Sequence, residues 1–157
     1  MSSDLTRRSL IGAAFAALVA CGFTPAYGPD GPATALRDRV SVTAPATVTG
    51  FALAQRIEDR IGQGDALRLL VDISDTREPA AVTVDGDTTR FQIVGIATWQ
   101  LLEGIEVRAE GRAETFTSYS ATGSTVATQS AEADALDRLA TALADRIVSD
   151  LILAQVP

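Results

Sequence analysis

The sequence predicts an α+β fold, a two-layer sandwich in which two helices pack on one face of a mostly antiparallel four-stranded sheet. Three observations predict it. Apolar residues alternate with polar ones through much of residues 67–119, which is typical of strands. Turn residues divide that region into hairpins. From about residue 128 to residue 154 the apolar residues instead recur with the period of a helix.

The first predicted strand covers residues 40–42, and a helix follows it. Breakers and candidate capping residues precede this helix at Pro45, Thr47, Thr49 and Gly50, and Gly62 and Gly64 end it. The residues expected to share its buried face are Phe51, Ala54, Ile57 and Ile61.

Three strands joined by hairpins come next. Residues 67–73 alternate with period two, and Pro79 restricts where that strand can be central. After a turn at Asp85-Gly86, residues 90–102 form a strand. Its residues Phe91, Ile93, Ala97, Trp99 and Leu101 are expected on one face, and Val94 and Ile96 on the other. Residues 105–119, after Glu103-Gly104, show the clearest alternation in the chain.

The last predicted element is a helix over residues 128–154. Its apolar stripe consists of Leu136, Leu139, Leu143, Ile147 and Leu151. Burying side chains of this size contributes roughly 1.5 to 3 kcal/mol each, so this helix is expected to stabilise the core most.

The first twenty residues have the pattern of a secretory signal. Arg7 and Arg8 precede an uncharged apolar run over residues 10–20, which is shorter than the roughly 20 residues that a membrane-spanning helix needs. The arginine pair fits either twin-arginine or general secretory export, and the route stays open. We therefore assign residues 1–20 to a signal peptide, residues 21–35 to a tether and residues 36–157 to the folded domain.

Cys21 is the only cysteine, and it directly follows the apolar run in the sequence LVAC. This matches the lipobox of bacterial lipoproteins, whose cysteine receives a lipid. A buried structural cysteine is the alternative. Several acyl chains together make membrane attachment persistent, so Cys21 is predicted to be a membrane anchor. Gly22 follows in place of the aspartate that retains enterobacterial lipoproteins in the inner membrane, which favours the outer membrane.

Composition excludes several classes of function. The net charge is −7, which disfavours nucleic acid as a partner. There is no histidine and only one cysteine, so the usual zinc sites and the Ser-His and Cys-His nucleophile pairs cannot form.

An enzyme that uses paired carboxylates stays an alternative, because acidic residues are dense between two strands, at Asp72, Asp75, Glu78, Asp85 and Asp87. Turns account for these residues more simply, and the sequence DGDTT lacks the remaining ligands of a calcium loop. We expect no cofactor apart from the covalent lipid.

The cysteine that opens CGFTPAYG, the order of strands and helices, and the closing helical sequence ATQSAEADALDRLATALADRIVSDLIL together resemble the LptE family of lipopolysaccharide-assembly lipoproteins. The resemblance covers residues 21–157. It implies a non-catalytic outer-membrane lipoprotein on the periplasmic side. Such a protein plugs and helps to assemble the LptD β-barrel, and it assists lipopolysaccharide delivery to the outer leaflet.

Arginine side chains are the expected contacts for the phosphates of lipopolysaccharide. Arg90, Arg108 and Arg112 lie on neighbouring predicted strands, and their even numbers allow them to share one face. Ordinary ion pairing with Glu106, Glu110 and Glu114 is the alternative. For the whole protein the alternative function is an auxiliary lipoprotein of an ABC-type transport system.

Overall fold

The computed structural model describes residue 28 and residues 31–154, and its elements follow the predicted order. A short 3-10 helix, η1 (Pro32–Ala35), precedes β1 (Val40–Thr43) and α2 (Val48–Ile61). The long strands β2 (Leu67–Val82), β3 (Thr88–Glu103) and β4 (Glu106–Ser120) come next, followed by α3 (Thr125–Leu153). These elements confirm the predicted α+β fold class.

The four strands form one sheet in the order β1-β2-β3-β4. β1 pairs with β2 in parallel, starting with Val40 opposite Leu67, because α2 carries the chain back across the sheet. The hairpins β2-β3 and β3-β4 are antiparallel. The sheet is therefore mostly antiparallel, as predicted.

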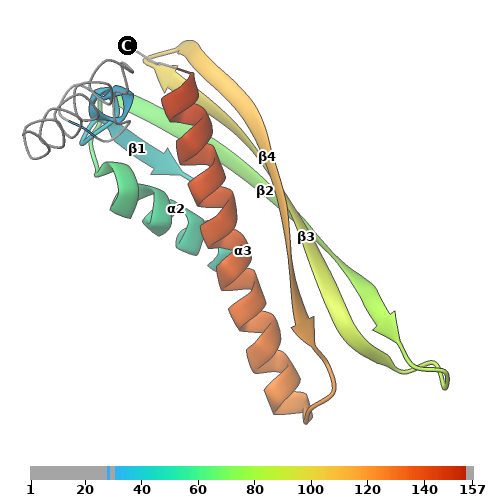
Figure 1. Ribbon diagram of the computed structural model, residues 1–157. Coiled ribbons are helices and arrows are strands. Elements are labelled where there is room, and N and C mark those ends of the chain that lie inside the picture. Colours follow the sequence, from blue (N-terminus) through green and yellow to red (C-terminus); the bar gives the residue numbers. More distant parts are fainter. Residues whose placement is uncertain (1–27, 29–30, 155–157) are drawn as a thin grey trace, which may run out of the picture.

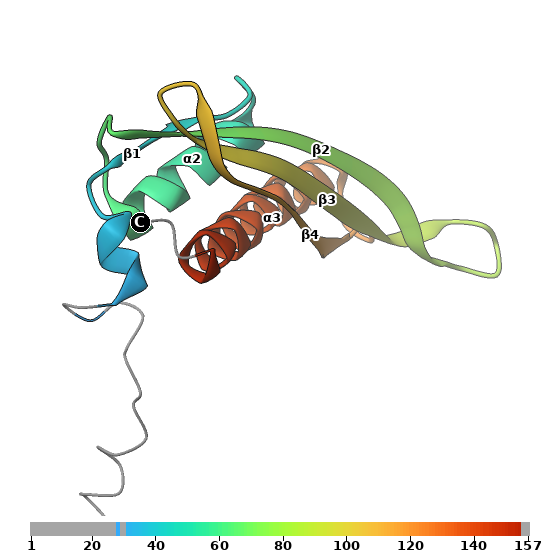
Figure 2. The same cartoon turned by 90° about the horizontal axis from the view of Figure 1, so that it is seen from above.

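Both helices lie on the same side of the sheet, as the two perpendicular views in Figures 1 and 2 show. The core lies between these two layers. It is formed by odd-numbered residues of β2 and β3, by the apolar stripe of α3, and by buried residues of β1 and α2 such as Val40 and Ile57. The predicted inward residues of β3 are confirmed, since Ile93, Ala97, Trp99 and Leu101 are buried and Phe91 packs against the core. The α3 residues Leu139, Leu143, Ile147 and Leu151 are completely buried.

α2 begins at Val48, because Thr47, one of the candidate capping residues, accepts a side-chain hydrogen bond from the Gly50 amide at 3.0 Å. Its predicted buried face is partly wrong. Leu53, Ile57 and Ile61 are buried, whereas Phe51 is 68% exposed. Three residues along an α-helix fall about 60° short of a full turn. Phe51 lies two such steps before Ile57 and therefore points about 120° away from it. The buried stripe instead follows steps of four residues.

α3 is 29 residues long and begins at Thr125, three residues before the predicted start. The Ser124 side chain caps it by accepting from the Ala127 amide at 3.3 Å. Asp145, in the second half of α3, binds the two helices together. Its Oδ1 lies 3.1 Å from Arg56 Nε and 2.8 Å from Arg60 Nη1, both on α2.

The β2-β3 hairpin extends beyond the core (Figure 1) and turns at Gly86, whose φ of 91° suits the predicted Asp85-Gly86 turn. Pro79 is tolerated because β1 pairs only with the beginning of β2, which leaves the far part of β2 with one neighbour.

Arg77 fixes this far half of the sheet to α3. Its Nη1 lies 2.7 Å from Glu132 Oε1 and donates to the Tyr119 hydroxyl at 3.3 Å. Its guanidinium also lies 5.2 Å from the centre of the Phe91 ring, which stacks on Tyr119. The pKa of Arg77 is raised above its ordinary value, mainly by the hydrogen bond to Tyr119 and next by the charge of Glu132.

Candidate interaction face of the sheet

Three strands present one face that neither helix covers (Figure 2). Side chains alternate along a strand, so the even-numbered residues opposite the buried ones point away from the helices. The register brings them into rows: Leu70, Gln100 and Glu110; Asp72, Thr98 and Arg112; Ser74, Ile96 and Glu114; and Thr76, Val94 and Phe116. We call the surface formed by these four rows the open face.

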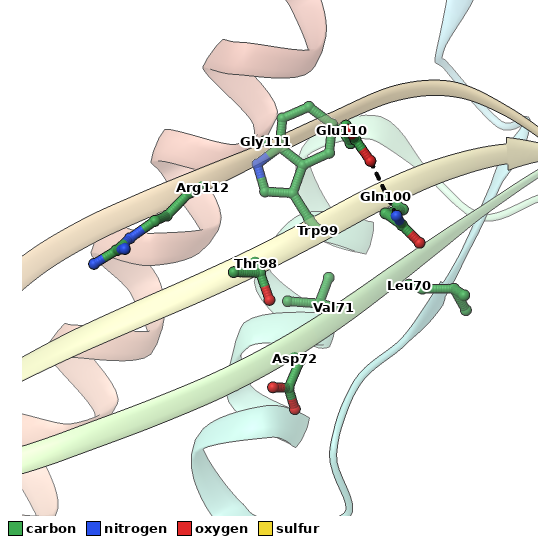
Figure 3. A pocket seen from close by; sticks show the side chains of 9 residues that line it. All are labelled: Leu70, Val71, Asp72, Thr98, Trp99, Gln100, Glu110, Gly111 and Arg112. Carbon is green, nitrogen blue, oxygen red and sulfur yellow. Dashed lines mark hydrogen bonds between the residues drawn. The ribbon is translucent and has the colours of Figure 1, made fainter.

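The first two rows line an open groove of about 560 Å³, which Figure 3 shows from close by. Gln100 Nε2 donates to Glu110 Oε2 across it at 3.0 Å. Small-molecule sites of this size are lined mainly by apolar and aromatic side chains. Here the apolar lining residues are Leu70, Val71 and Trp99, and most of the others are polar or charged. This mixed lining in an open groove suits the surface of another macromolecule better than an enclosed small ligand.

A second depression, of about 340 Å³, lies at the other end of the open face. Phe116, which is 64% exposed, lines it together with Val94, Glu114 and Gln92. The open face therefore has a polar part around Arg112 and a more apolar part around Phe116.

The three arginines predicted to contact lipopolysaccharide do not gather at one place. Arg112 lies on β4, opposite Thr98 of β3. Arg90 is itself a β3 residue and lies eight positions before Thr98. At about 3.3 Å per residue this is roughly 26 Å. Arg108 is the extra residue of a bulge, because Leu101 pairs with Ala109 and Leu102 with Val107. The bulge interrupts the even-number alternation on which the prediction of a shared face relied.

Two of these arginines form ion pairs. Arg108 Nη2 lies 2.6 Å from Glu103 Oε2 and its Nη1 lies 3.6 Å from Glu106 Oε2. Arg112 Nη2 lies 2.8 Å from Glu114 Oε2. Glu110 bonds Gln100 instead of an arginine. Exposed pairs of this kind contribute only about 0 to 1 kcal/mol, so a charged partner can replace them at little cost.

Sequence reasoning missed the pairing of Trp99 with Gly111, its cross-strand neighbour on the buried side. A Cβ on Gly111 would lie 2.6 Å from Trp99 Cζ2, so the indole occupies the space of the missing side chain. Trp99 Nε1 is the buried side-chain polar atom without a hydrogen-bond partner in the described residues. A glycine inside a strongly alternating strand was the signal that indicated such a close contact.

The acidic residues between the two strands, which raised the alternative of an enzyme, do not form a metal site in the described residues. Asp72 and Asp75 are an odd number of positions apart on β2, which directs them to opposite faces. Within residues 31–154 no three acidic or cysteine side chains lie close enough to hold a metal ion. The described helices include none that is long and apolar enough to cross a membrane. Cys21 lies outside the described residues.

The family model for LptE, described as lipopolysaccharide-assembly, matches residues 37–151. The chain belongs to the LptE family. This match covers β1 through nearly all of α3 and therefore includes the entire sheet and both helices. It gives no support to the alternative of an ABC-type transport lipoprotein. Among curated proteins none matches the sequence significantly.

Solved structures share the fold of this LptE-family chain. A candidate lipoprotein from Caulobacter crescentus CB15 is 22% identical, with a TM-score of 0.64 over 77% of this chain and 93% of its own. The rare lipoprotein B of Shewanella oneidensis is 14% identical, with a TM-score of 0.58 over 75% of this chain and 96% of its own. A minor lipoprotein from Acinetobacter baumannii is 17% identical, with a TM-score of 0.51 over 76% and 94%.

Proposed function

We propose that this LptE-family chain is anchored through a lipid on Cys21 to the periplasmic leaflet of the outer membrane. There it occupies the lumen of an LptD-type β-barrel, helps that barrel to assemble, and assists lipopolysaccharide in reaching the outer leaflet. The observation that carries the proposal is the family match over residues 37–151.

The surface of the domain is compatible with a barrel lumen. The interior of a wide outer-membrane barrel is polar, so a protein that fills it needs mixed charges instead of a continuous apolar face. The open face supplies Asp72, Glu110, Arg112 and Glu114 among threonine, serine and glutamine side chains. The outward side of α3 adds Asp134, Arg138 and Arg146.

The length of the domain also suits this location. The 29 residues of α3 correspond to about 43 Å at 1.5 Å per residue. This exceeds the roughly 30 Å of hydrocarbon that a barrel wall crosses. A domain of this length can extend through the full height of a barrel.

The role proposed for the chain is non-catalytic. Arg90, Arg108 and Arg112 remain the proposed contacts for lipopolysaccharide phosphates. Because Arg90 lies far along the sheet from the other two, it would meet a different part of the ligand. Arg108 and Arg112 would have to exchange their glutamate partners for phosphate.

Depletion of the protein in its native cells tests the proposal. We expect lipopolysaccharide labelled at the cell surface by a non-permeant probe to decrease, and expression of the wild-type chain to restore it. The assembled form of the barrel should decrease in parallel, because the chain is proposed to act on assembly. Normal surface labelling after depletion would exclude the proposed function.

A further inference from the structure

The domain is elongated, and only one of its two ends is close to the start of the described chain. Figures 1 and 2 show η1, the β3-β4 turn and the last turn of α3 together at this end, which we call the anchor end. Gly28 belongs to it, because its carbonyl accepts from the Gly31 amide at 3.0 Å, directly before η1. The first turns of α3 and the β2-β3 turn form the opposite end, which we call the distal end.

The two ends are farther apart than the two surfaces of a membrane. β3 runs from the distal end to the anchor end, and its 16 residues correspond to about 50 Å at 3.3 Å per residue. The β2-β3 turn, residues 83–87, extends beyond the start of β3. A bilayer with its headgroups is about 40 to 45 Å thick. The domain is therefore long enough to place one end at each membrane surface.

The length of chain between Cys21 and the domain determines which end can lie outermost. Residues 22–28 span at most about 25 Å, because a fully extended chain advances no more than about 3.6 Å per residue. With the lipid of Cys21 in the periplasmic leaflet, Gly28 and the anchor end stay within this distance of that leaflet. The outer surface, about 40 to 45 Å away, is out of their reach. The distal end must then be the outer one.

The β2-β3 turn is suited to an aqueous position beyond the sheet. Ser120 of β4 pairs with Arg90, so in the described part of the chain β2 and β3 continue past β4 as a two-stranded ribbon. The side chains of residues 79–87 are all exposed. Two of them, Asp85 and Asp87, flank Gly86 in the turn, and ionised carboxylates require water or a partner.

We propose that the β2-β3 turn, residues 83–87, emerges at the outer mouth of the barrel and is exposed at the cell surface, whereas the β3-β4 turn stays on the periplasmic side. This inference rests on the proposed function, from which it takes the lipid on Cys21 and the position inside a barrel. It adds the direction of the domain and names the segment of this chain that meets the outside of the cell.

Single cysteines at the two turns test this direction in the full-length protein. Val84→Cys and Ile105→Cys are a matched pair, because both side chains are branched at Cβ and almost completely exposed. Neither change should disturb the fold, since both positions lie on the surface. Cys21 is the only other cysteine, and its thiol is blocked in the lipidated chain. Cells with the wild-type chain therefore give the labelling background.

One sample of native cells is treated with a membrane-impermeant maleimide while intact, and a second sample after its outer membrane has been permeabilised. We expect most Val84→Cys chains to be labelled in intact cells, and Ile105→Cys chains to be labelled only after permeabilisation. Protection of Val84→Cys in intact cells would overturn the proposal. Equal labelling of both variants in intact cells would overturn it as well.

Copurification of the barrel with each variant separates failure of this inference from failure of the proposed function. If the barrel copurifies and Val84→Cys is protected in intact cells, the chain occupies a barrel but its β2-β3 turn does not reach the surface. Only the proposed direction or reach is then wrong. If no barrel copurifies with either variant or with the wild type, the proposed function itself fails.

Discussion

At the scale of single residues, Gly111 is notable because an aromatic ring occupies the space beside it. A Cβ there would lie 2.6 to 2.8 Å from two ring atoms of Trp99, and the ring is 4% exposed and rigid. At Gly95 a Cβ would instead meet the two terminal methyl groups of Leu139 at 2.8 and 3.0 Å. The end of a leucine side chain can rotate, whereas a packed indole must move as a whole.

We therefore expect Gly111→Ala to lower the free energy of unfolding by about 1 to 3 kcal/mol through overpacking. Gly95→Ala should cost less, because only a leucine end has to shift. Urea unfolding of the two variants beside the wild type measures the difference. Equal costs would contradict the close packing of Trp99 on Gly111.

At the scale of elements, α3 connects the whole domain. Its second half buries Leu143, Ile147 and Leu151 against the sheet and reaches α2 through Asp145. Its first half is tied to β4, because Thr117 Oγ1 donates to the Ala135 carbonyl at 2.9 Å. Loss of packing on this helix therefore affects both layers.

Leu143→Ala should lower the free energy of unfolding by about 2 to 5 kcal/mol, because it leaves a cavity in the core. Leu153→Ala is the matched control on the same helix. Leu153 is 78% exposed, so its loss should change stability by no more than about 0.5 kcal/mol. Similar effects of both substitutions, measured by denaturant unfolding, would contradict the central role of the α3 stripe.

The observed elements also show which features could be predicted from the sequence alone. Alternation in β3 predicted the inward set that includes Ile93 and Trp99 correctly, because one face of that strand is buried along most of its length. Phe51 was misplaced because a short helix allows several apolar stripes, and the choice between them depends on packing. The bulge at Arg108 has no signal in the alternation, and it separates Arg108 from the even-numbered pattern of Arg112.

At the scale of the whole molecule, the family resemblance rested on the segment that begins at Cys21, the order of elements and the closing helix together. The family match confirms the family, and the observed elements confirm the fold class. The proposed arginine site depended on distances between strands that only the register supplies. The lipid on Cys21 remains a prediction from the lipobox, since that residue lies outside the described part of the chain. The domain itself has a helical side and an open face on which charged and polar residues are mixed with apolar ones.

Purification of the full-length protein from native outer membranes after mild crosslinking tests this account most directly. An unrelated lipoprotein with the same type of anchor serves as the control for non-specific membrane capture. We predict that one large β-barrel protein copurifies with this chain in about equal amount and is absent from the control. Recovery of transport-system components without any barrel, or of no partner at all, would contradict the account.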